Sequence, residues 1–165
     1  MTISLPIDPA DIPTAQEKGV RVVNGVPMFY KKKPMKDFED RLELLLKPYY
    51  PKLRIPDGEP AFLHIVFLYG YTASTPKKRR IDMLRVTTRP DGDNLSKAII
   101  DACADRWAKD RKTRKFHVVR RGFFRDDAQA NPTVISRFRT TGTPRTVIVV
   151  KQAERQAVSI PQPNP

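Results

Sequence analysis

The stretch formed by residues 89–102 combines a turn with an amphipathic helix, and so limits how the rest of the chain can pack. Pro90 disfavours helical backbone at the residue before it, and Gly92 makes the turn flexible. Asp93 or Asn94 can then cap the helix that follows. Apolar residues recur from this point at the spacing of one helical face: Leu95, Ala98, Ile99 and Ala102. This spacing predicts a helix with one buried stripe.

A second face of this predicted helix carries charge. Asp93, Lys97 and Asp101 are spaced four residues apart and therefore share one side, with Asp91 just ahead of them. Two carboxylates at a helix entrance, with a lysine one turn further on, can bind a metal ion and a phosphate. Asp and Asn are also the commonest turn and cap residues, so the cluster alone could simply begin a helix.

A second acidic pair, Asp126 and Asp127, favours the metal-site interpretation. It follows the aromatic residues Phe123 and Phe124 in a very basic neighbourhood. The whole chain has a formal net charge of +13, so carboxylates kept together in it indicate a cation-binding site.

Composition limits the classes of protein that fit. A chain of 165 residues with 39% hydrophobic content is expected to form one domain, here residues 1–151, with a disordered Pro-rich tail at 152–165. The positive charge indicates a polyanionic partner, with nucleic acid first and an acidic membrane surface second. No apolar run approaches the roughly 20 residues that span a bilayer, and no secretory signal is visible.

The few Cys and His residues exclude several chemistries. The single cysteine, Cys103, cannot form an internal disulfide and is expected to be a small core or interface residue of an intracellular protein. Together with His64 and His117 it cannot supply an ordinary four-ligand zinc site. His64 lies in an apolar run and is expected to be a core residue. No Walker loop or dinucleotide fingerprint is present, so no small-molecule cofactor is expected.

The remaining pattern predicts an α+β fold, a small mixed sheet with helices packed against it. Strands are expected near residues 3–7, 61–71, 133–138 and 146–150, with 61–71 as the central strand. Asn24 and Gly25 predict a hairpin turn because both tolerate positive φ. Pro34 begins a predicted helix that Pro48 ends, and the helix that starts after Pro90 is expected to continue to about Trp107.

Two basic segments can bind DNA phosphates, although each could also be a solvated surface. One is the long loop 72–88 and the other is the stretch 109–125, which can form a short strand or hairpin. The candidate DNA-binding residues are Lys77, Lys78, Arg79, Arg80, Arg111, Lys112, Arg114, Lys115, Arg120 and Arg121. The aromatic residues Phe123, Phe124 and Trp107 could wedge against bases, or could belong to the core.

The two acidic motifs, in this order, resemble those of the RusA family of Holliday junction resolvases, which are common in phages and prophages. The resemblance is carried by Asp91-Gly92-Asp93-Asn94-Leu95-Ser96-Lys97, then Asp101, and Asp126-Asp127-Ala128-Gln129. It covers roughly residues 19–150, and residues 137–146 resemble the family's last hairpin. The chain differs from most relatives in its longer basic segment between residues 104 and 122.

The resemblance implies a Mg²⁺- or Mn²⁺-dependent endodeoxyribonuclease that acts as a homodimer and cuts four-way DNA junctions symmetrically. It implies that Asp91, Asp93 and Asp127 hold the metal, that Asp126 lies in the same motif, and that Lys97 lies near the scissile phosphate. It also implies a phage- or prophage-encoded protein in the cytoplasm of a bacterial host, with no membrane partner.

Other functions remain open on the sequence. The chain could be a basic nucleic-acid-binding protein in which the aspartates only cap and turn, or a relative that binds branched DNA without cutting it. A protein that binds an acidic protein or membrane surface has no basic amphipathic helix to support it. Cutting that requires Mg²⁺, with binding that does not, would favour the enzyme.

Overall fold

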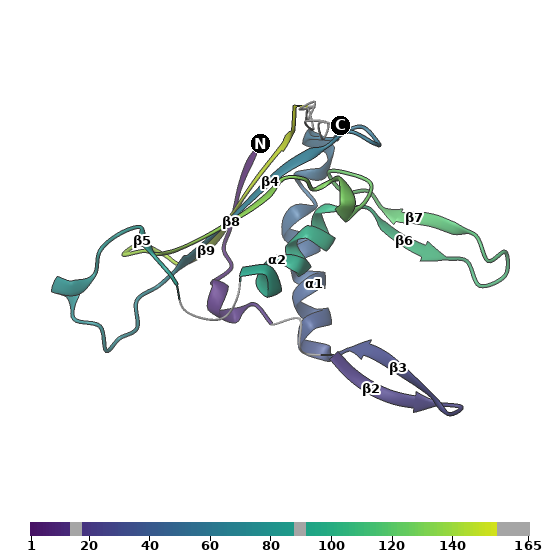
Figure 1. Ribbon diagram of the computed structural model, residues 1–165, viewed down its shortest axis with the longest axis horizontal. Helices are drawn as coiled ribbons and strands as arrows, with labels where there is room; N and C mark the ends of the chain where they lie inside the picture. The colour runs from purple at the N-terminus through teal and green to yellow at the C-terminus, as the bar shows by residue number, and fades with distance from the viewer. Residues whose placement is uncertain (14–17, 88–91, 155–165) are drawn as a thin grey trace, which may run out of the picture.

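A five-stranded mixed sheet forms the body of the protein in the computed structural model, which describes residues 1–13, 18–87 and 92–154 (Figure 1). The strands lie in the order β1-β9-β4-β8-β5. Their bounds are Thr2–Leu5 for β1, Ala61–Tyr69 for β4, Leu84–Arg85 for β5, Thr133–Arg139 for β8 and Arg145–Gln152 for β9. The strand β4 runs parallel to β8 and antiparallel to β9. The predicted α+β class and the central position of β4 are confirmed.

The strand β4 separates a covered face of the sheet from an open one. Its alternate residues Ala61, Leu63, Ile65 and Phe67 are fully buried in the core. Phe62, His64 and Val66 point to the other side and are only partly buried. The prediction that His64 belongs to the core is wrong, because its side chain lies on this open face and is only partly buried. Its ring is satisfied within the sheet by a hydrogen bond with Ser136 Oγ on β8 (2.9 Å).

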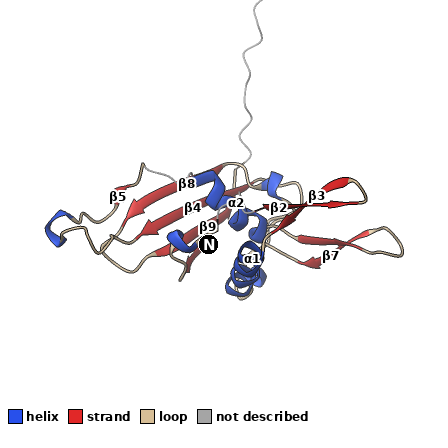
Figure 2. Cartoon of the chain, turned by 90° about the horizontal axis from the view of Figure 1, so that it is seen from below, coloured by secondary structure: helices blue, strands red, loops and turns tan. Residues whose placement is uncertain are grey.

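Two helices, α1 (Lys33–Leu46) and α2 (Gly92–Cys103), pack side by side and bury their apolar stripes in the same core (Figures 1 and 2). The buried residues of α1 are Met35, Phe38, Leu42 and Leu46, and Leu95, Ala98, Ile99 and Ala102 of α2 join them as predicted. Pro34 lies in the first turn of α1, where a missing amide hydrogen costs nothing. No helix in the described part of the chain has the length and apolarity to cross a bilayer.

Two hairpins project from the body on the same side of the molecule (Figure 1). The first pairs β2 (Lys18–Val23) with β3 (Val26–Lys31), and the second pairs β6 (Arg106–Lys109) with β7 (Phe116–Arg120). The turn of the first contains Asn24 at φ 51° and Gly25 at φ 77°, so the predicted hairpin is confirmed. The second occupies the basic stretch, where the sequence allowed a strand or a hairpin.

The predicted end of the second helix near Trp107 is wrong, because α2 stops at Cys103. The chain then pairs with the segment around Phe123 and Phe124, through Phe123 N–H to the Cys103 carbonyl (2.7 Å) and Asp105 N–H to the Phe124 carbonyl (2.9 Å). Gly122 permits this approach, since a Cβ there would overlap the backbone of Cys103 and Ala104. A contact across almost twenty residues therefore ends the helix.

The expected final hairpin is also corrected. The strands β8 and β9 follow one another in the chain, but β4 lies between them in the sheet. The segment 140–144 therefore crosses the end of β4 instead of closing a hairpin turn. The proposed domain 1–151 and tail 152–165 stay predictions: Gln152 is the last residue of β9, and residues 155–165 lie outside the described part of the chain.

Candidate functional site

The charged face of α2 and the second acidic motif meet in one hollow. Lys97 and Asp101 lie one turn apart on α2, and Asp127 begins the short 3-10 helix Asp127–Gln129 that faces them. These three residues line a hollow of about 370 Å³ together with residues of β8 such as Ile135. The two motifs, separated by about 25 residues in the sequence, are thus brought together as the metal-site interpretation requires.

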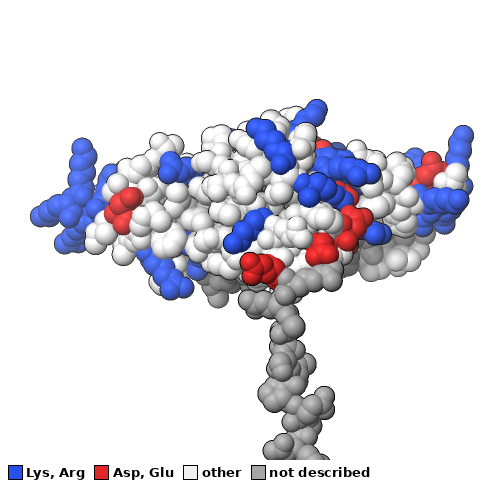
Figure 3. Space-filling view, turned by 90° about the horizontal axis from the view of Figure 1, so that it is seen from above, with Lys and Arg blue, Asp and Glu red and all other residues white. Residues whose placement is uncertain are grey.

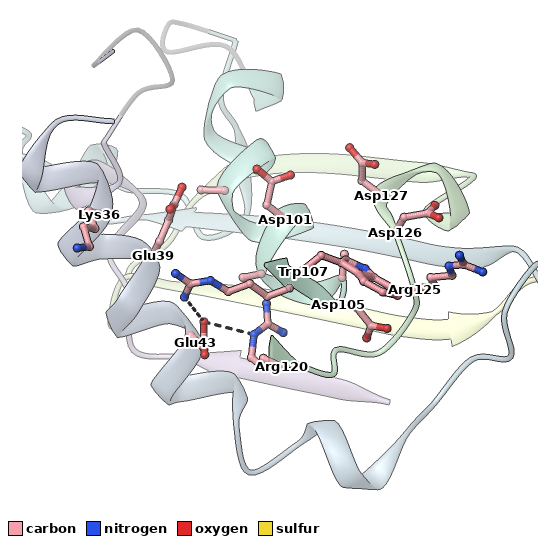
Figure 4. A pocket seen from close by; sticks show the side chains of 14 residues that line it. Lys36, Glu39, Glu43, Asp101, Asp105, Trp107, Arg120, Arg125, Asp126 and Asp127 are labelled. Carbon is pink, nitrogen blue, oxygen red and sulfur yellow. Dashed lines mark hydrogen bonds and ion pairs between the residues drawn. The ribbon is translucent and has the colours of Figure 1, made fainter. Parts of the chain in front are cut away.

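A second, larger hollow of about 520 Å³ shares Asp101 and Asp127 with the first (Figure 4). Asp126 lines it as well, and Glu39 and Glu43 of α1 form its opposite wall. In Figure 4 the carboxylates of Asp101 and Asp127 point to the same side. The acidic residues therefore lie along an open groove between α1, α2 and the 126–129 turn.

Gln129 holds the acidic turn in place. Its side-chain carbonyl accepts a hydrogen bond from the Arg125 N–H (2.8 Å). Its amide nitrogen donates to the carbonyls of Pro56 (2.9 Å) and Glu59 (2.8 Å) in a distant loop. All three bonds end on backbone groups, so Gln129 fixes the turn that carries Asp126 and Asp127. These three hydrogen bonds give a structural reason for the glutamine in the second acidic motif.

The entrance of α2 lies close against the sheet. A Cβ on Gly92 would come within 2.8 Å of the Ile135 side chain on β8, so glycine allows the helix to begin there. Asp93 lies in the first turn of α2, but its side chain, and the whole of Asp91, lie outside the described residues. The roles predicted for these two aspartates therefore remain predictions.

The described carboxylates are suitable ligands for a hard cation such as Mg²⁺, but they do not form a metal site without further ligands. The side chains that line the larger hollow and could bind a metal are all carboxylates, and Mg²⁺ prefers such oxygen donors; they are Glu39, Glu43, Asp101, Asp105, Asp126 and Asp127. Among the residues that the structure describes, no three His, Cys, Asp or Glu side chains are grouped as metal ligands. A complete site would therefore need Asp91 or Asp93 as well.

Arg120 is part of the wall of the groove. Its Nε lies 3.3 Å from Glu43 Oε2, its guanidinium lies 4.9 Å from the centre of the Tyr50 ring, and its side chain is only 13% exposed. Tyr50 in turn donates to the Ala102 carbonyl (2.9 Å), and burial raises the pKa of its hydroxyl well above the usual range. Since these contacts occupy Arg120, we leave it out of the proposed DNA surface.

A partly buried ion pair anchors the base of the β6–β7 hairpin. Both nitrogens of the Arg54 fork donate to Asp105, at 2.6 Å and 3.1 Å, and Asp105 also accepts from the Gly122 N–H (2.7 Å). The hydrogen bond to Asp105 raises the pKa of Arg54 above its already high value. The two ends of the basic segment are therefore joined to the body next to the acidic turn.

Seven of the other basic side chains named by the sequence lie at the two ends of the molecule, whereas Arg121 is exposed at the base of the β6–β7 hairpin. Arg111, Lys112, Arg114 and Lys115 are exposed at the tip of the β6–β7 hairpin. Lys77, Lys78 and Arg79 are exposed in a short 3-10 helix at the opposite end of the molecule. Figure 3 shows Lys and Arg side chains gathered at both ends of the molecule, with Lys, Arg, Asp and Glu side chains interspersed between them.

The loop that carries Lys77–Arg79 is held by its own hydrogen bonds. The Tyr71 hydroxyl donates to the Ile81 carbonyl (2.7 Å) and accepts from the Ile81 N–H (3.0 Å). Arg80 donates to the Thr75 carbonyl (3.0 Å), which makes it a structural residue of the loop. Asp82 accepts from Thr140 Oγ1 and the Thr141 N–H, both at 3.0 Å.

The wedge hypothesis is wrong for Phe123 and Phe124, which are fully buried core residues. Trp107 is partly exposed at the rim of the larger hollow, with the Arg125 guanidinium 5.7 Å from its ring centre. Cys103 is fully buried in the core, as predicted, and burial raises the pKa of its thiol to about 12.

Comparison with known protein families identifies the chain. The model of the family described as endodeoxyribonuclease RusA matches residues 9–121. The chain belongs to this family. A search of curated proteins finds no match to it. The activity that defines RusA proteins, hydrolysis of internal phosphodiester bonds in DNA, is therefore the one that the groove has to explain.

The family match and the geometry cover different parts of the site. The matched residues include the acidic turn and α2 but end before Asp126 and Asp127. The second motif is therefore connected to the first by its position across the hollow from Lys97 and Asp101. Asp101 and Gln129 were recognised in the motifs without an assigned role. Glu39, on a helix some sixty residues away, had no signal in the sequence.

Proposed function

We propose that this RusA-family protein is a divalent-metal-dependent endonuclease that resolves four-way DNA junctions by paired, symmetric cuts. The observation that carries the proposal is the position of Asp127 across one hollow from Lys97 and Asp101 of α2. The family membership supplies the reaction, and the basic ends of the molecule supply a reason for DNA binding.

The proposed metal ligands are Asp91, Asp93 and Asp127, with Asp126 beside them. Mg²⁺ or Mn²⁺ bound there would lower the pKa of a coordinated water and neutralise charge on the phosphate. The carboxylates orient the reacting groups and keep the site selective for a hard cation. The described donors are all oxygens, which supports this assignment.

Lys97 is proposed to contact the scissile phosphate. Its side chain is exposed, it lines the same hollow as Asp127, and an ammonium group there can donate to a non-bridging phosphate oxygen. The alternative is that Lys97 only pairs with Asp93 or Asp101. A Lys97→Ala variant that retains metal-dependent cleavage would support this second role.

The basic side chains at both ends of the molecule are proposed to hold the arms of the junction through phosphates. Such contacts recognise the shape and charge of DNA and not its sequence. A four-way junction has two equivalent strands to cut, so a symmetric homodimer would bring one active site to each. A phage or prophage origin and action in a bacterial host cell remain part of this proposal.

The proposal is tested by incubating the purified protein with a synthetic four-way junction and a matched linear duplex, with Mg²⁺ or with a chelator. We expect paired symmetric nicks in the junction only, lost with chelator and in an Asp93→Asn variant. Tight binding of the junction without cutting would contradict the enzyme and favour a relative that only binds branched DNA. Equal binding of junction and duplex would favour a general nucleic-acid-binding protein.

A further inference from the structure

The β2–β3 hairpin is an arm that is separate from the five-stranded sheet. In the described part of the chain its strands pair only with each other, and it projects away from the sheet (Figure 1). A lone two-stranded hairpin is at best marginally stable in water. The arm therefore needs a surface that covers it.

Apolar side chains cover both faces of this arm. The pairing register places Val20, Val22 and Pro27 on one face and Val23, Val26, Met28 and Tyr30 on the other. The exposed fractions of the valines, Met28 and Tyr30 run from 39% to 68%. Gly19 lies opposite Tyr30, and a Cβ there would overlap the tyrosine ring, so glycine lets the ring lie across the strand.

The size and chemistry of this surface fit a protein partner. Together these side chains expose on the order of several hundred Å² of apolar area, more than scattered surface residues contribute. A stable protein interface buries about 800 Å² on each partner, with an apolar centre. The arm can therefore supply an apolar centre for one side of such an interface.

The second hairpin gives an internal comparison. The tip of the β6–β7 hairpin carries Arg111, Lys112, Arg114 and Lys115, which are the side chains expected to contact phosphates. The β2–β3 arm has only Lys18, Arg21 and Lys31 in fourteen residues, and mostly Val, Met and aromatic residues otherwise. The strands of the β6–β7 hairpin also expose Trp107, Phe116 and Val119, so the two hairpins differ at their tips. The β6–β7 tip is basic and suited to DNA, whereas the β2–β3 tip carries Val23 and Val26 and is suited to protein.

We propose that the β2–β3 arm is the surface through which two copies of this chain associate. The identity of the partner rests on the proposed function, because paired cuts in a symmetric junction require two active sites. A two-fold axis would place the same apolar residues on both sides, so one self-complementary surface is sufficient. In the dimer the arm loses its exposure to water and gains the stability that an isolated hairpin lacks.

Sedimentation of the full chain, without DNA or added metal, tests this inference separately from the nuclease activity. We expect the wild-type chain to form a dimer. Val22→Lys and Val26→Lys place a lysine on opposite faces of the arm. Each variant is compared with the wild-type chain, and one or both should weaken association tenfold or more. The matched control is Val119→Lys on β7, which places the same charge on a half-exposed valine of the other hairpin.

Two further measurements keep the result unambiguous. Far-ultraviolet circular dichroism, which reports the backbone fold, should be unchanged in the variants, because the substituted side chains are exposed. Amide hydrogen exchange of residues 18–31 should slow as the protein concentration rises. A wild-type chain that stays monomeric, or a dimer that both arm variants leave intact, would overturn the proposal. Loss of the dimer in the Val119→Lys control alone would also overturn it.

Discussion

Asp127 faces α2 because Gln129, two residues further on, fastens its turn to the loop containing Pro56 and Glu59. In the proposed function this aspartate can act only if its carboxylate stays opposite Asp101 and Lys97, with which it lines one hollow. The chemistry therefore depends on residues that contact the substrate and on others that hold them in place.

The Asp127→Asn variant should lower junction cleavage at least about a hundredfold, which is the scale of one well-placed catalytic group. The amide keeps the size of the side chain but removes the negative charge that would bind a cation. Junction affinity measured in chelator should change little. Asp40→Asn, an exposed site on α1, makes the same charge change away from the groove and should cleave normally. Equal activity in both variants would remove Asp127 from the site.

The Gln129→Ala variant should lower cleavage by about tenfold, the smaller effect expected of a positioning residue. Because the side chain only holds the turn, a higher Mg²⁺ concentration should restore much of the lost rate. Gln129→Glu offers the matched comparison, since its carboxylate can still accept from the Arg125 N–H but cannot donate to Pro56 and Glu59. A Gln129→Ala variant with the wild-type metal dependence would contradict this role.

Arg54→Ala should lower the free energy of unfolding by about 2 to 4 kcal/mol. The loss should be smaller than for a fully buried ion pair, because the Arg54 side chain is partly exposed. The loss strands Asp105, whose side chain is only 4% exposed. The control Arg106→Ala removes an exposed pair with Glu43 and should cost less than about 1 kcal/mol. Urea denaturation of both variants gives the comparison, and equal losses would contradict it.

At the scale of elements, local signals predicted local structure well. Asn24 and Gly25 adopt the positive φ angles that their turn requires. The stripe from Leu95 to Ala102 is buried as its spacing indicated. The end of α2 could not be predicted in this way, because the contact of Cys103 and Ala104 with residues 122–124 sets it. The insertion of β4 between β8 and β9 likewise depends on pairing between distant segments.

The same distinction applies to the candidate site. The sequence placed both acidic motifs in one site by resemblance, and the structure brings Asp127 to α2. The sequence could not show that Arg120 packs between Glu43 and Tyr50, because those partners come from a distant helix and loop. Basic residues are alike in a sequence, and only their burial separates those that can contact DNA from those that hold the fold.

The tip of the β6–β7 hairpin should contribute to DNA affinity and not to the chemical step. Replacing Arg111, Lys112, Arg114 and Lys115 with glutamine should weaken junction binding. It should also reduce the slope of log affinity against log salt by up to about 0.9 for each phosphate that the protein no longer neutralises. Cleavage at saturating protein should stay near the wild-type rate. Lys47→Gln, at an exposed lysine just after α1, is the control and should leave the slope unchanged.

The basic loop at the other end of the molecule should loosen in acid. Hydrogen bonds from the Thr141 N–H and the Thr140 hydroxyl lower the pKa of Asp82 below its usual range. A lowered folded-state pKa means that the stabilisation is complete above the ordinary Asp value of about 3.9. It is lost as the pH falls through the folded-state value. The NMR signals of residues 72–87 should therefore shift over that range, and Asp82→Asn should abolish the pH dependence.

At the scale of the whole molecule, the sheet and two helices serve as a platform with three projections. The basic loop 77–79 and the basic tip of the β6–β7 hairpin lie at opposite ends of the molecule, and the apolar β2–β3 arm projects beside that hairpin (Figure 1). The groove with its six carboxylates lies in the body, beside α1 and α2. In our proposals this division places DNA contacts, chemistry and association on separate elements. Each function can therefore be removed by substitutions that leave the others intact.

The acidic turn before α2, the charged face of α2 and the 126–129 turn should act together as one divalent-metal site. Iron-mediated cleavage of the protein tests this directly: Fe²⁺ replaces Mg²⁺, and ascorbate and peroxide are added, so that radicals cut the backbone next to the bound ion. We expect cuts in both 91–101 and 126–129, suppressed together by excess Mg²⁺. Cuts in only one of these segments, or elsewhere in the chain, would contradict a shared site.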